Sequence, residues 1–168
     1  HGAFAKLEKN IAAFSKGAPA GRKRPPVCVN MVINCLNEGN VATALDYVKD
    51  NPYIDNISLN FHTPFEETEE LYLDPARRNE IIDMLIEKKR SGYPIMNTVP
   101  GLKAMRVRDR WCWVTNFIFS DGSRSPKCMG YTDGVCDRCG FSMGGEMYSL
   151  FHFSPATIAA GLNLRKRV

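Results

Sequence analysis

Apolar residues recur at helical spacing in three parts of the chain, and each part predicts an amphipathic helix. The first helix is predicted over residues 3–15. Its apolar face consists of Phe4, Leu7, Ile11 and Phe14. The second is predicted over residues 40–50, with Asn40 as a plausible N-cap. Its apolar stripe consists of Val41, Ala44, Leu45 and Val48.

The third helical segment, residues 74–93, has the clearest start and stop signals. Asp74 can cap the helix, Pro75 suits its first turn, and Gly92 suits its C-terminal stop. Its apolar side carries Ile81, Leu85 and the aliphatic stem of Lys88, with Ile82 and Ile86 beside them. These signals predict one well-defined helix.

Short β-rich runs lie between the helices, at "PPVCVNMVIN" (25–34), "IDNISLNF" (54–61) and "YPIMNT" (93–98). The first alternates imperfectly, which favours a strand covered on both faces. Strands separated by helices of this length form right-handed crossovers and a parallel sheet. Three such strands do not close a barrel, so this α/β region looks like half of a larger sheet.

The character of the chain changes after residue 100, which divides it into regions 1–100 and 101–168. The stretch "WCWVTNFIFSDGSRSPKC" predicts two short strands around the turn "SDGS", which is a hairpin signal. A cysteine-rich loop follows. A last helix is predicted over "SPATIAAGLNL", with Ser154 as N-cap and Pro155 at its first position.

Composition excludes several classes of protein. The 168 residues carry a net charge of +4, and the basic stretch 16–24 contains glycine and proline in the manner of a loop. This argues against a nucleic-acid groove, which needs more basic residues and interleaved aromatics. No apolar run reaches the roughly 18 residues of a spanning helix, and no secretory signal opens the chain. The start at His1 suggests a fragment or a processed chain.

Four of the six cysteines form the candidate chemical site. They follow the spacing C-x15-C-x7-C-x2-C, at Cys112, Cys128, Cys136 and Cys139. Four converging thiolates suit tetrahedral zinc or a cubane iron–sulfur cluster, and spacing alone does not choose between them. Disulfides and unrelated core cysteines are further alternatives. Cys28 and Cys35 lie in an apolar stretch and are expected to act as small hydrophobes.

Three stretches together resemble the C-terminal half of a radical S-adenosylmethionine (radical SAM) protein. They are "VNMVINCLN", "DNISLNFHTPFEETEELYLDPARRNEIIDMLIEKKRSGYPIMNT" and "WCWVTNFIFSDG…C…C..CG". The resemblance is to members with a cysteine-bearing C-terminal extension of the SPASM or twitch kind. It implies a partial (β/α)6 barrel whose last three strands are residues 27–34, 56–61 and 94–98, followed by a small cysteine-rich hairpin and helix extension.

The resemblance also implies chemistry and partners. Cys112, Cys128, Cys136 and Cys139 would bind an auxiliary [4Fe–4S] cluster, sheltered by Trp111 and Trp113. The parent would be a cytoplasmic oxidoreductase that uses S-adenosylmethionine, an electron donor protein, and a small-molecule or peptide substrate. The family's CxxxCxxC loop is absent here. A missing N-terminal half would therefore carry the catalytic cluster, and this chain alone should be inactive.

Polar residues at the strand ends are the candidate SAM and substrate contacts. Ligands of parallel sheets lie at the carboxyl ends of the strands. This places Asn34, Asn60, His62 and Asn97 at one mouth. The alternative is structural, because Asn34 and Asn97 could cap strand ends and His62 could bond within a turn. The acidic residues 66–70 favour a solvated loop face.

A function of a different class remains open. The chain could be a zinc-stabilised α/β interaction module, in which the cysteines are structural and the basic ends dock an acidic partner. Such a metal would be redox-silent, and folding would be lost on chelation.

Overall fold

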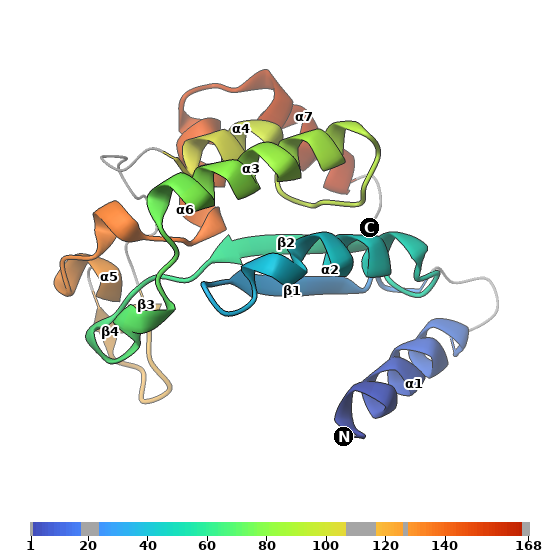
Figure 1. Ribbon diagram of the computed structural model, residues 1–168. Helices are drawn as coiled ribbons and strands as arrows, with labels where there is room; N and C mark the ends of the chain where they lie inside the picture. The colour runs from blue at the N-terminus through green and yellow to red at the C-terminus, as the bar shows by residue number, and fades with distance from the viewer. Residues whose placement is uncertain (1, 18–23, 107–116, 126–127, 166–168) are drawn as a thin grey trace.

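The computed structural model describes residues 2–17, 24–106, 117–125 and 128–165. The fold is mixed α/β, as the sequence predicts (Figure 1). The elements before residue 106 are α1 (Ala3–Lys16), β1 (Cys28–Ile33), η1 (Glu38–Asn40), α2 (Val41–Asp50), β2 (Asn56–Phe61), η2 (Glu66–Leu71), α3 (Pro75–Arg90) and α4 (Val99–Ala104). Those after it are β3 (Phe117–Ile118), β4 (Arg124–Ser125), α5 (Met129–Thr132), η3 (Cys136–Arg138), α6 (Ser142–Phe151) and α7 (Pro155–Arg165).

The main sheet consists of β1 and β2, paired in parallel from Cys28 opposite Asn56 to Ile33 opposite Phe61. The predicted third strand, residues 94–98, is present only as a single parallel bridge between Ile57 and Ile95. Pro94 has no amide hydrogen to donate, and helix α4 begins directly after Thr98, so the segment is too short for a regular strand. The parallel order is as predicted. A barrel is not formed by the described residues.

The core lies against one face of β2, where Ile57, Leu59 and Phe61 are buried. Strand alternation puts every second residue on this face, and α2 and α3 cover it with aliphatic side chains such as Leu45 and Leu85. Each fully buried aliphatic side chain contributes about 1.5–3 kcal/mol relative to exposure. This core fixes β2 and the segments that follow its carboxyl end.

The other face of the sheet is polar and partly open, which corrects the expectation that β1 is covered on both faces. Cys28, Asn30 and Val32 alternate as exposed residues along β1. Cys28 and Cys35, which the sequence predicts to act as small hydrophobes, are both exposed and do not pack in the core. Cys28 points to the open face, and Cys35 lies in the turn after β1, where its thiol donates to Glu70 O over 3.1 Å.

Asp74 and Gly92 bound α3 as the sequence predicts, whereas Asn40 does not cap α2 with its side chain. The carboxylate of Asp74 accepts from the amides of Ala76 and Arg77, and Gly92 has a φ of +93° just after α3. Asn40 precedes α2 as predicted, but its side chain makes no capping bond. The backbone of Asn40, with a φ of −96° and a ψ of 0°, continues the preceding 3-10 turn η1. It therefore lacks the extended geometry that aims an N-cap side chain at the helix.

The sequence patterns did not reveal helices α4 and α6, nor the single-turn helix α5. Helices α4 and α6 cross at Gly101 and Gly145. The two backbones are so close there that an added Cβ on Gly145 would lie 2.6 Å from Gly101 O. The short length of α4 and the glycines of α6 hide both from helical periodicity. The predicted final helix is confirmed and begins at Pro155. No helix among the described residues is long and apolar enough to span a membrane.

The predicted hairpin is confirmed where it is described, as the antiparallel pair β3 and β4. Gly122, in the "SDGS" turn, has a φ of +81°, which glycine adopts without strain. Residues 111–116, predicted as part of the first strand, lie outside the described residues. At the other end of the chain, the ribbon of α1 lies apart from α3 and α4 (Figure 1).

Candidate functional site

The cysteine-rich segment docks on the carboxyl end of β2. The amide of Phe61 donates to Gly140 O over 2.8 Å, and the amide of Gly140 donates to the hydroxyl of Thr63 over 3.0 Å. An added Cβ on Gly140 would lie 2.0 Å from Phe61 O, so only glycine permits this approach. The Cys136–Phe141 turn is therefore placed at the strand end where parallel sheets bind their ligands.

Arg78 of α3 holds the same turn in place through hydrogen bonds to its backbone carbonyls. Its guanidinium donates to Cys139 O over 2.9 Å, Arg138 O over 3.3 Å and Met105 O over 2.8 Å. It also stacks over the ring of Phe61, 4.9 Å from the centroid. Only 7 % of the side chain is exposed. One buried cation thus links α3, the end of α4 and the cysteine turn.

The sulfur of Cys139 receives two hydrogen bonds. The amide of Phe141 donates to Sγ over 3.5 Å, and the hydroxyl of Thr63 donates to it over 3.8 Å. Cys136 begins the turn, and its carbonyl accepts from the amide of Cys139 over 3.3 Å. Donors aimed at sulfur stabilise a thiolate ligand and tune a bound cluster. Whether Cys136 and Cys139 bind a metal stays a prediction.

Cys128 begins the compact loop that leads to this turn. Its carbonyl accepts from the amides of Tyr131 and Thr132, and the amide of Val135 closes back onto Gly130 O over 2.9 Å. No disulfide joins the cysteines that the structure describes. Within the described residues, no three His, Cys, Asp or Glu side chains are grouped closely enough to hold a metal ion. Cys112, the predicted fourth ligand, lies outside the described residues, as do Trp111 and Trp113.

Of the four predicted mouth residues, Asn60 is bonded to Ser142, just after the cysteine turn. Its Oδ1 accepts from the amide of Ser142 over 2.8 Å, and its Nδ2 donates to Asn30 Oδ1 over 2.8 Å. His62 follows on the next turn, where Nε2 lies 3.1 Å from both O and Oγ1 of Thr68. Both side chains are half-buried and already bonded within the protein.

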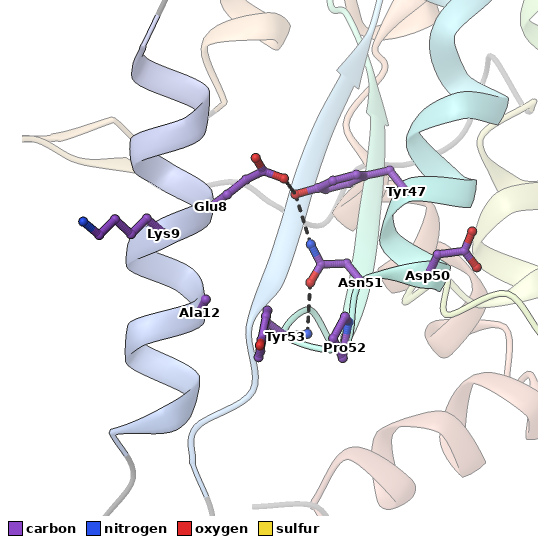
Figure 2. A pocket seen from close by; sticks show the side chains of 8 residues that line it. All are labelled: Glu8, Lys9, Ala12, Tyr47, Asp50, Asn51, Pro52 and Tyr53. Atoms are coloured by element: carbon purple, nitrogen blue, oxygen red, sulfur yellow. Dashed lines mark hydrogen bonds between the residues drawn. The ribbon is translucent and has the colours of Figure 1, made fainter.

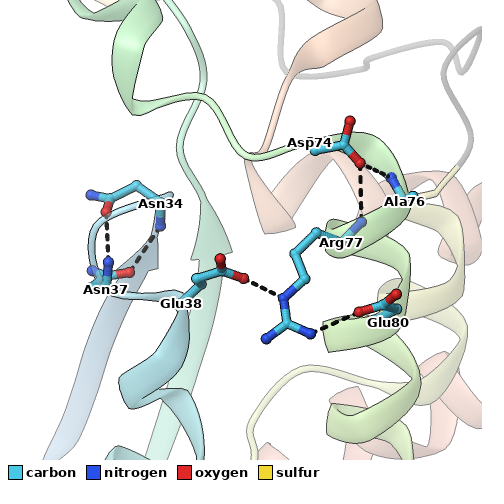
Figure 3. A network of polar contacts seen from close by, with 7 residues as sticks. All are labelled: Asn34, Asn37, Glu38, Asp74, Ala76, Arg77 and Glu80. Carbon is cyan, nitrogen blue, oxygen red and sulfur yellow. Dashed lines mark hydrogen bonds and ion pairs between the residues drawn. The ribbon is translucent and has the colours of Figure 1, made fainter.

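Asn34 and Asn97 have structural partners. The amide of Asn34 donates to Asn37 Oδ1, and its own Oδ1 accepts from the amide of Asn37 (Figure 3). Asn97 is buried, and its side chain bonds both the N–H and the C=O of Leu59, in place of a strand ladder. Such hydrogen bonds are those expected if Asn34 and Asn97 have a structural role at the strand ends. Roles for Asn34, Asn60, His62 and Asn97 in binding SAM stay predictions.

The turn after β1 is connected to α3 by charged side chains (Figure 3). Arg77 binds the carboxylate of Glu38 through Nε and that of Glu80 through Nη1, the latter at 2.7 Å. In the acidic stretch, Glu69 pairs with Arg138 of the cysteine turn. The other glutamates of this stretch, Glu66, Glu67 and Glu70, are exposed, as expected of a solvated loop face.

A shallow hollow lies between α1 and the loop after α2, and it holds a chain of hydrogen bonds (Figure 2). The hydroxyl of Tyr47 donates to Glu8 over 2.9 Å and accepts from Asn51 Nδ2 over 3.0 Å, and Asn51 Oδ1 accepts from the amide of Tyr53. Burial, followed by the bond to Glu8, raises the pKa of Tyr47. This chain attaches α1 to α2.

Sequence reasoning missed Glu146 and Lys89, both of which line a deeper pocket under the polar face of the sheet. Glu146 lies in helix α6, which was expected to be loop, and Lys89 belongs to a basic run at the end of α3 that suggests solvent exposure. Comparison with protein-family models, with curated proteins and with solved structures gave no match for this chain.

Proposed function

We propose that this chain is the C-terminal part of a radical SAM iron–sulfur oxidoreductase. In this proposal Cys112, Cys128, Cys136 and Cys139 bind an auxiliary [4Fe–4S] cluster. The observation that carries it is the docking of the C-x2-C-G turn on the carboxyl end of β2, through the bond from Phe61 to Gly140. A cluster there would lie beside the end of the sheet where α/β enzymes bind substrates.

The chain's own residues would hold and orient the ligands. Thr63 and the Phe141 amide donate to Cys139 Sγ, which fixes the position of that sulfur in the turn. Arg78 fixes the carbonyls of the turn, so the sulfurs are presented from a rigid base. The described cysteines are not yet grouped, and a metal commonly orders its own ligands on binding. The proposal therefore includes movement of Cys128 and its loop towards the Cys136–Cys139 turn, which Arg78 holds in place.

A bound cluster of this kind supplies one-electron chemistry or an anchoring position for a substrate. The CxxxCxxC loop that holds a catalytic cluster is absent from this sequence. Reductive cleavage of SAM would therefore require an N-terminal half, and an electron donor protein would serve the assembled enzyme. In this proposal the assembled enzyme works in a reducing, cytoplasmic setting.

Anaerobic reconstitution with iron and sulfide tests this proposal. The expected product is brown, binds about four irons per chain and absorbs broadly near about 400 nm. Cys136→Ser and Cys139→Ser should abolish the colour. Cys28→Ser and Cys35→Ser are matched controls on exposed cysteines outside the spacing and should retain it. A colourless protein that binds one zinc and unfolds on chelation would instead establish the zinc interaction module.

A further inference from the structure

A pocket of about 650 Å³ lies between the polar face of β2, the segment after α3, and helices α6 and α7. Its wall is apolar and includes Met96, Met143, Met147 and Leu150. Methionine side chains are flexible and polarisable, so they adapt to apolar ligands of irregular shape. A volume of this size, with a mostly apolar lining and a few polar groups, is typical of small-molecule sites.

A carboxylate lies in this pocket. Glu146, on α6, is half-buried, and its two oxygens accept from the amide of Thr98 over 2.8 Å and from the hydroxyl of Thr98 over 2.5 Å. Burial raises the pKa of Glu146, which the bonds from Thr98 oppose. A carboxylate has about four lone-pair sites, so two accepted bonds leave room for a donor from a ligand.

An ammonium group lines the same pocket. Lys89, at the end of α3, donates from Nζ to Ile95 O, and two of its three hydrogens have no partner among the described residues. Burial lowers the pKa of Lys89, and the charge of Glu146 opposes that shift. Each charge influences the other, yet among the described residues no ion pair of 4.0 Å or less joins them.

The two charged groups have opposite hydrogen-bonding needs. The Glu146 carboxylate can accept a further hydrogen bond from a ligand donor, and the Lys89 ammonium can donate to a ligand acceptor. Asn56, at the start of β2, also lines the pocket, but its Oδ1 is buried and out of reach of a ligand.

We propose that this pocket binds a free α-amino acid with a large apolar side chain. The ligand's ammonium would donate to Glu146, its carboxylate would accept from Lys89, and its side chain would pack against the methionine wall. A zwitterion of this kind is a small molecule that satisfies both separated charges at once. The site does not involve the cysteines and stands apart from the proposed function.

Methionine-methyl NMR of the full chain tests the site without any variant. The probes are L-phenylalanine, phenethylamine, which lacks the carboxylate, and 3-phenylpropionate, which lacks the ammonium. L-phenylalanine should shift the methyl signals of Met96, Met143 and Met147. The signals of Met31 and Met84, which do not line the pocket, should stay in place. The two truncated probes should bind at least tenfold more weakly.

Substitutions then assign the charges. Glu146→Gln and Lys89→Met should each weaken L-phenylalanine at least tenfold, whereas Glu87→Gln, an exposed glutamate of α3, should leave its affinity unchanged. Circular dichroism checks that each variant is folded, and where one is not, the probe series alone decides. Equal binding of phenethylamine, equal shifts at Met31, or no shift with any probe would overturn the proposal.

Discussion

The β/α region, residues 24–106, and the described part of the cysteine-bearing region, residues 117–165, are held together by different interactions. In the first region, β2 and α3 share a core of aliphatic side chains. These residues alternate along the strand and recur at helical spacing along the helix. In the second, few large side chains are fully buried, and Val135 is its only large aliphatic residue in the described core. Close glycine contacts and the hydrogen bonds of Arg78 hold it instead.

The difference indicates which region would gain more stability from the proposed cofactor. A core of aliphatic side chains is stable without help, whereas a segment with little buried apolar surface needs a crosslink or a metal. The cysteine-bearing region exposes Phe141, Phe151 and Phe153, the last with 82 % of its surface accessible. Its stability should therefore respond to metal, and that of the β/α region should not.

The largest effect is expected in the core of the β/α region. Leu59→Ala leaves a cavity beside α3 and should lower the free energy of unfolding by about 3–4 kcal/mol, measured by urea denaturation. Val32→Ala, on the open face of β1 with 44 % exposure, should cost less than about 1 kcal/mol. Equal losses at the two positions would show that the sheet is covered on both faces.

The next effect is expected where the two regions touch. Gly140→Ala introduces a Cβ that would lie 2.0 Å from Phe61 O, so the cysteine turn must move away from β2. The expected loss is about 2–3 kcal/mol, together with reduced iron uptake. Gly39→Ala is the control, since an added Cβ there meets nothing within 4 Å. Unchanged stability and iron content in Gly140→Ala would contradict the docking of the cysteine turn on β2.

Two neighbouring arginines offer a finer comparison. Arg78→Met removes the bonds to the carbonyls of Met105, Arg138 and Cys139 and should destabilise the protein by about 2 kcal/mol. Arg77→Met removes only surface ion pairs and should cost less than about 1 kcal/mol. Thermal unfolding of both variants measures the difference, and a reversed order would contradict the role given to Arg78.

The smallest effect is a change in pH dependence. Because burial raises the pKa of Glu146, the unfolded chain loses this proton near pH 4.5 while the folded chain still holds it. Stability should therefore fall as pH rises from about 4.5 towards the pKa of the folded state. Glu146→Gln should remove this fall, and Glu87→Gln should keep it. Urea titrations at several pH values measure the slope, and an unchanged slope in Glu146→Gln would refute the assignment.

Local patterns predicted the β/α region well, for physical reasons. Asp74 and Gly92 bound α3 because a cap and a left-handed stop act within a few residues. The third strand was overestimated because apolar composition does not reveal that Asn97 replaces the ladder with side-chain bonds. The sequence does not reveal that one face of β1 is open, because the burial of a strand face depends on segments distant in the sequence.

Of the candidate site, the sequence could propose only the cysteines, and their binding of a cofactor stays a prediction. Spacing indicated Cys136 and Cys139, since a C-x2-C-G turn brings two thiols together locally. Arg78 could not be assigned its role from sequence, because its three carbonyl partners come from segments 27 to 61 residues away. Glu146 was hidden in a glycine-rich helix without a clear apolar stripe.

Electron paramagnetic resonance of the anaerobically reconstituted chain, recorded after dithionite reduction, tests the central claim most directly. A reducible cluster held by Cys112, Cys128, Cys136 and Cys139 should give a signal that disappears in Cys139→Ser and persists in Cys35→Ser. A silent spectrum from a protein that binds one zinc per chain would contradict the account.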